Sequence, residues 1–141
     1  MRIRLTLALV ACAVVMSLAL PGNAQKKGKT RPLTTSQMMA GLIKPQLTML
    51  KEGLEAGPKD DDAWKAIATS AALLNESAYL MMDDGRCPDK VWSDGCVMLE
   101  KATVEILKQV DAKNATAALA GVDGVTASCK HCHTEHKYKK Q

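Results

Sequence analysis

Apolar residues recur along this chain at alternating steps of three and four residues, and they do so in four separate segments. This spacing places them on one face of an α-helix, whereas the every-second-residue alternation of a strand does not occur. The four stripes are Met39, Ile43, Leu47, Leu50 and Leu54; Trp64, Ile67, Ala71, Leu74, Ala78 and Met81; Trp92, Cys96, Leu99, Thr103, Ile106 and Val110; and Ala118, Val122, Val125, Cys129, Cys132 and His136. The connections between them are short, so the sequence predicts an all-α fold, an antiparallel four-helix bundle. We rank an α-solenoid below it, because the sequence has no self-similar period.

Polar residues that suit helix ends precede each stripe. The expected N-caps are one of Thr34, Thr35 and Ser36, one of the aspartates at 60–62, then Asp89, and finally Asn114. Pro45 lies inside the first stripe, where a proline removes one backbone hydrogen bond and clashes with the preceding turn. We therefore expect a kink or a break in the first helix.

The chain begins like a secretory signal peptide. Arg2 and Arg4 precede an uncharged apolar run over residues 5–20. This pattern predicts a signal peptide over residues 1–24 that is cleaved on export, to the periplasm or an equivalent compartment. An uncleaved membrane anchor and lipidation of Cys12 are the alternatives.

The rest of the chain divides into a leader and one domain. Residues 25–33 are basic and polar, which predicts a flexible leader, and residues 34–141 are expected to form the bundle domain. No later apolar run reaches membrane length, so we expect no stable membrane insertion once the signal is removed. Two of the four net positive charges belong to Arg2 and Arg4, and the mild charge that remains does not indicate a nucleic-acid binder.

Cys129, Cys132 and His133 form the sequence C-x-x-C-H, which is the attachment motif of c-type haem. On a helix, positions i, i+3 and i+4 share one face. Both thiols can then reach the two vinyl groups of one porphyrin edge, while the neighbouring imidazole binds the iron. The motif predicts one covalent haem c, with thioethers at Cys129 and Cys132 and with His133 as the proximal iron ligand.

Three other uses of the motif are weaker. A zinc site that includes His136 would crowd its ligands onto two helical turns, where they cannot surround a tetrahedral ion. A thioredoxin-type redox pair requires a βαβ setting, which an all-α chain lacks. A plain disulfide leaves His133 without a role.

With this motif on its last helix, the chain resembles the class II cytochromes c, the cytochrome c-prime family, from the end of the leader onward. The resemblance implies a four-helix bundle with haem near the C-terminus, and a basic residue one turn beyond the histidine, here Lys137. His136 stands where the family often has an aromatic residue, so we expect it to pack near the proximal side instead of binding a metal. It also implies that the sixth iron position faces the first helix, where Met39 stands. Met38 or Met49 could serve instead if Pro45 rotates that helix, and packing in the core is the other role open to Met39.

Cys87 and Cys96 flank the start of the third helix, and the family does not generally have them. In an exported chain their expected use is a disulfide, which would stabilise this corner by about 2–3 kcal/mol. A pair of buried thiols is the alternative.

Together these features favour an exported electron carrier. Haem with histidine and methionine ligands suits a shuttle between redox partner proteins. Without a distal side chain, the chain resembles the five-coordinate cytochromes c-prime that bind nitric oxide; the third hypothesis is a haem-free, disulfide-stabilised helical envelope protein. We expect no enzyme, because no catalytic triad, paired carboxylate site or phosphate loop occurs. The resemblance is also compatible with a homodimer formed through the first two helices.

Overall fold

The structure, a computed structural model, describes residues 27–137. The predictions for residues 1–24, including lipidation of Cys12, lie outside these residues. Over the described range the chain forms four helical rods. The first rod is interrupted and consists of α1 (Thr35–Met38), the π-helical turn η2 (Met39–Ile43) and α2 (Lys44–Glu55). The other three rods are the long helices α3 (Asp61–Met82), α4 (Lys90–Asp111) and α5 (Ala115–His136). In this part of the chain, every helix is too short or too polar to cross a lipid bilayer.

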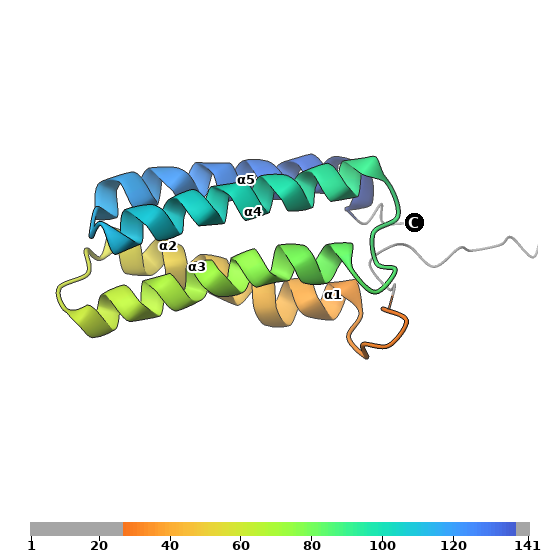
Figure 1. The fold of residues 1–141 in the computed structure, drawn as a ribbon, viewed down its shortest axis with the longest axis horizontal. Coiled ribbons are helices and arrows are strands. Elements are labelled where there is room, and N and C mark those ends of the chain that lie inside the picture. Colours follow the sequence, from red (N-terminus) through yellow and green to blue (C-terminus); the bar gives the residue numbers. More distant parts are fainter. Residues whose placement is uncertain (1–26, 138–141) are drawn as a thin grey trace, which may run out of the picture.

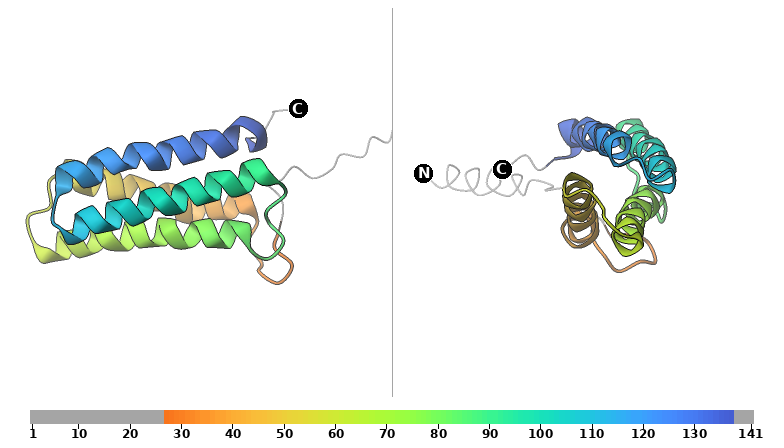
Figure 2. Two further views of the ribbon diagram at one scale, coloured as in Figure 1. Left: turned by 45° about the horizontal axis from the view of Figure 1, so that its top comes forward. Right: turned by 90° about the vertical axis from the view of Figure 1, so that its left-hand side faces the viewer.

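Consecutive helices run in opposite directions (Figure 1), which confirms the predicted all-α, four-helix architecture. α4 and α5 share the most extensive contact, followed by α3 with α4 and α2 with α3, whereas the contact between α2 and α5 is smaller than each of these three. Seen end-on in Figure 2, the four rods form an incomplete ring, with α5 and the first rod on either side of the opening. The C-terminal end of α5 and the start of α1 lie at the same end of the bundle (Figure 1).

Each of the four rods begins at a cap that the sequence predicted. The side-chain oxygens of Thr34, Asp60, Asp89 and Asn114 accept hydrogen bonds from backbone N–H groups of the first turn, which have no partner within the helix. Thr34 also forms a capping box with Gln37, whose side chain accepts from the Thr34 N–H at 2.8 Å. The start of each rod is therefore fixed locally.

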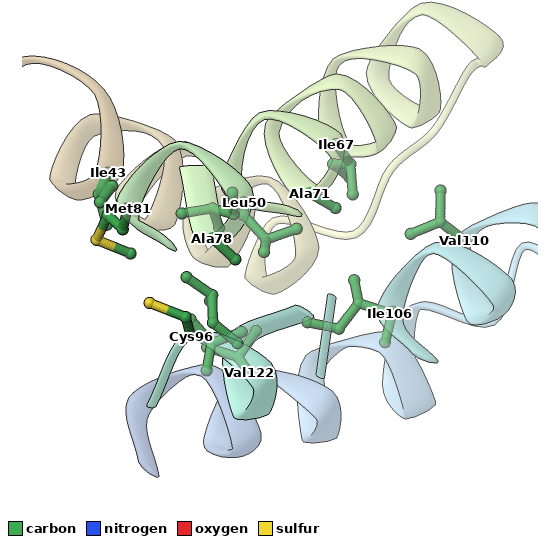
Figure 3. Close-up of a cluster of buried hydrophobic side chains, with 14 of the residues drawn as sticks. Ile43, Leu50, Ile67, Ala71, Ala78, Met81, Cys96, Ile106, Val110 and Val122 are labelled. Carbon is green, nitrogen blue, oxygen red and sulfur yellow. The ribbon is translucent and has the colours of Figure 1, made fainter. Parts of the chain in front are cut away.

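The core is built from the predicted faces of the helices, and Figure 3 shows part of it. Almost every residue of the second and third stripes is buried, and so are Ala118, Val122 and Val125 on α5. The first rod differs from the prediction: Met38 is buried, while Met39 and Leu47 are only partly so. This shift occurs at η2, directly before Pro45, where the structure confirms the predicted break in α-helical geometry.

The described part of the basic leader makes ordered contacts that its composition did not predict. The backbone N–H groups of Thr30 and Arg31 donate to the carboxylate of Asp84, at 2.9 and 3.0 Å, in the turn after α3. The buried Arg86 donates from its guanidinium to the carbonyl of Leu33 at 2.7 Å. These bonds fasten the approach to α1 onto the α3–α4 turn.

Candidate functional site

The C-x-x-C-H segment lies within the last turns of α5, as the sequence predicted. Cys129, Cys132 and His133 all line one cavity of about 740 Å³. Their common helix face therefore opens onto a partly open space between the rods, and the cavity is of the size that small-molecule and cofactor sites have, roughly 300–1,000 Å³.

All four rods contribute to the walls of this cavity, which are largely apolar. The residues opposite the motif come from the first rod, α3 and α4: Met39, Ile43, Leu47, Met81, Cys96 and Leu99. Figure 3 shows Ile43, Met81 and Cys96 together at one end of the buried cluster. An apolar space with two thiols and an imidazole on one wall suits a flat, mostly apolar group fixed along one edge.

The two motif thiols are protonated at neutral pH. Burial raises the pKa of Cys129, and it raises the pKa of Cys132 to about 11, with a further contribution from the negative charge of Asp89. Thiol–disulfide catalysis depends on the opposite shift, toward a stable thiolate. The environment of the pair thus disfavours a thioredoxin-type role.

His133 is suited to bind a metal. Burial lowers its pKa, and the positive charge of Lys137 lowers it further, so the imidazole is uncharged at neutral pH and presents a nitrogen lone pair. Lys137 stands directly after α5, and its backbone N–H donates to the His133 carbonyl at 3.2 Å. Among the described residues, no group of three or more His, Cys, Asp or Glu is arranged to hold a metal ion by itself.

His136 packs on the end of α4, in agreement with the packing role expected of it. Its side chain is 7% exposed, its ring meets the edge of Trp92 at a centroid distance of 5.4 Å, and its Nε2 lies 3.2 Å from a carboxylate oxygen of Asp89. Because Asp89 also caps α4, these contacts fasten the last turn of α5 to the first turn of α4.

Gly95 brings α4 very close to the motif. A Cβ atom at this position would lie 3.0 Å from the Cβ of Cys132 and 3.5 Å from the carbonyl oxygen of Ser128. The contact with the Ser128 carbonyl is an ordinary van der Waals contact, whereas the contact with the Cys132 Cβ is tight, so an added side chain would require Cys132 to shift by a few tenths of an ångström.

Gly95→Ala is expected to destabilise the protein by about 1–3 kcal/mol, because the added methyl overpacks the α4–α5 contact. Gly41→Ala is the matched control: it adds the same methyl where nothing lies within 4 Å, and its expected effect is neutral or stabilising by up to about 1 kcal/mol. Urea unfolding followed by circular dichroism measures both. Equal stabilities of the two variants would contradict the close approach at Gly95.

The structure distinguishes between Met38, Met39 and Met49, which the sequence left as alternative iron ligands. Met39 lines the cavity, whereas Met38 is buried in the core and Met49, 53% exposed, lines a different hollow beside the α2–α3 turn. Met39 and His133 also share a smaller adjoining cavity of about 220 Å³, so the two side chains face the same space from opposite rods. Met81, which lines the main cavity from α3, was not predictable as a site residue, because its place in an apolar stripe is typical of core packing.

The disulfide predicted between Cys87 and Cys96 is not formed, and both residues carry free thiols. Cys96 is buried and lines the cavity; burial raises its pKa to about 12, and the nearby thiols of Cys132 and Cys87 add to the shift. The Cys87 sulfur is 3.4 Å from the Asp89 carbonyl, to which it donates. The alternative of a pair of buried thiols fits Cys96, whereas Cys87 is only partly buried.

The donors around the cavity fit haem c: two protonated thiols one helical turn apart, a neutral imidazole beside the second, a thioether on the facing rod, and apolar walls. Comparisons of the chain with protein-family models, with curated proteins and with solved structures found no match.

Proposed function

We propose that this chain is an exported c-type cytochrome that carries one covalent haem c and passes electrons between redox partner proteins. The observation that carries the proposal is the joint opening of Cys129, Cys132 and His133 onto one apolar cavity. Their spacing is the attachment motif, and their environment leaves the thiols protonated and the imidazole neutral.

Cys129 and Cys132 would hold the group by thioether bonds. Addition of each S–H across one vinyl group, the sulfur to one carbon and the hydrogen to the other, would need no external oxidant or reductant. His133, next to Cys132 in the chain, would bind the iron. When bound, haem supplies a one-electron couple between ferric and ferrous iron.

Met39 is the side chain that we propose would bind the iron as its second ligand. It lines the cavity from the rod that faces α5, and it shares the smaller adjoining space with His133. A thioether ligand raises the potential of haem iron and suits electron transfer. Lys137 places a positive charge near His133, and we assign it to the proximal side.

The position of the cavity supports a role in electron transfer. Its walls include residues of α5 and of the first rod, and these two stand on either side of the opening in the ring of helices (Figure 2). A group fixed there would have an edge within reach of a partner protein. We propose that these partners are redox proteins of the periplasm or an equivalent compartment, and sedimentation of the purified protein would show whether it forms a homodimer.

The test is to express the full-length chain in a host that matures c-type cytochromes, and then to record the mass and the visible spectrum of the exported protein. The expected result is the added mass of one covalent haem, a low-spin ferric spectrum and a methionine-to-iron band. A high-spin spectrum would favour the five-coordinate, nitric-oxide-binding alternative. A colourless protein without added mass would contradict the proposal and leave the haem-free helical alternative.

A further inference from the structure

The first rod contains a π-helical turn directly before a proline. In η2 the backbone N–H of Lys44 donates to the carbonyl of Met39, five residues earlier, and Pro45 is the next residue. In a regular α-helix the ring of Pro45 would press against the carbonyl of Gly41. A wider turn immediately before the proline relieves this clash.

This turn changes which methionine belongs to the core. Met38 and Ile43 are both buried, at 3% and 5% exposure, although they are five residues apart. In a regular α-helix such residues point roughly 140° apart. The π-helical turn brings them to one face, at whose edge Ile43 also reaches the cavity. Met39, next to Met38, lines the cavity, whereas Met38 does not.

Both ends of the rod are held, so the extra residue must be absorbed between them. The capping box of Thr34 and the burial of Thr35 fix α1, and the burial of Leu50 and Leu54 fixes α2. The extra residue of the π-helical turn is accommodated on the solvent-exposed side of the first rod. Gly41 is exposed there, and a Cβ at this position would meet nothing within 4 Å.

We propose that Pro45, acting through η2, is the positioning residue that presents Met39, and not Met38, to the haem iron. The inference rests on the proposed function, because it concerns the second axial ligand of the bound haem. Pro45 does not itself touch the iron; it sets the register of the helix that carries the ligand.

The test compares Pro45→Ala with the control Pro58→Ala, which removes a proline from the α2–α3 connection and leaves the first rod unchanged. Alanine favours a regular helix, so Pro45→Ala should fold, place Met39 in the core position and lose the methionine-to-iron band. Pro58→Ala should keep the band. A Pro45→Ala protein that binds haem and keeps the band would overturn the proposal.

A second variant restores the native register without the proline. When Gly41 is deleted from Pro45→Ala, Met38 stands four residues and Met39 three residues before Ile43, so a regular α-helix returns both side chains to their native faces. We expect the band to reappear, and a haem-loaded double variant without it would overturn the proposal. This rescue separates loss of register from general damage.

Failure of this inference differs from failure of the proposed function. A coloured wild-type protein without the band would show that no methionine binds the iron, which overturns the role of Pro45 and leaves haem attachment intact. A coloured Met38→Leu variant that loses the band would also overturn it, since Met38 would then be the ligand. A colourless wild-type protein would refute the proposed function, and this inference with it.

Discussion

Replacement of both Cys129 and Cys132 by serine is expected to abolish covalent haem binding. A hydroxyl does not form the thioether bonds that hold the porphyrin, and both attachment points on α5 are lost together. The exported variant should be colourless, and its mass should equal that of the mature polypeptide alone. Mass spectrometry under denaturing conditions and the visible spectrum measure the loss.

The chain supplies its own controls for this experiment. Cys96→Ser makes the same chemical change in the wall of the same cavity, and Cys87→Ser makes it in the loop before α4. Both single variants should retain one covalent haem, because neither thiol belongs to the motif. If Cys96→Ser loses the added mass, or if the double variant keeps it, the assignment of the attachment thiols is wrong.

The second large effect is expected at Met39. Met39→Leu keeps the size and apolar character of the side chain but removes its sulfur, so the iron would lose its second axial ligand. The methionine-to-iron band should disappear, the ferric spectrum should become high-spin, and the potential should fall by roughly 0.1 V or more, within the ~0.8 V that axial ligands span. Absorption spectroscopy and a potentiometric titration check these outcomes.

Met81→Leu is the matched control for Met39→Leu, because Met81 also presents a thioether to the cavity, from α3. It should keep both the band and a potential close to that of the wild-type protein. If Met81→Leu loses the band and Met39→Leu keeps it, the iron ligand is Met81 on α3 and the assignment of Met39 is wrong.

Local sequence determined most of the fold. The steps of three and four residues located each helix, and Thr34, Asp60, Asp89 and Asn114 located each helix start, because periodicity and capping act over a few neighbouring residues. The arrangement of the motif on one helix face was predictable for the same reason. The break near Pro45 was also predictable, although its type was not.

The features that depend on distances between helices were determined only by the tertiary structure. The exchange of Met38 for Met39 follows from two helix ends that are each held against other parts of the molecule, and a stripe of apolar residues does not contain that information. Likewise, the closeness of Gly95 to Cys132, the place of Met81 in the cavity wall, and the different burial of Cys87 and Cys96 all depend on how α3, α4 and α5 pack. Sequence by itself determined which residues form helices and which carry the motif, because those properties are local. Only the folded chain determined which side chains complete the cavity around the motif, because they come from rods that are distant in sequence and meet only through packing.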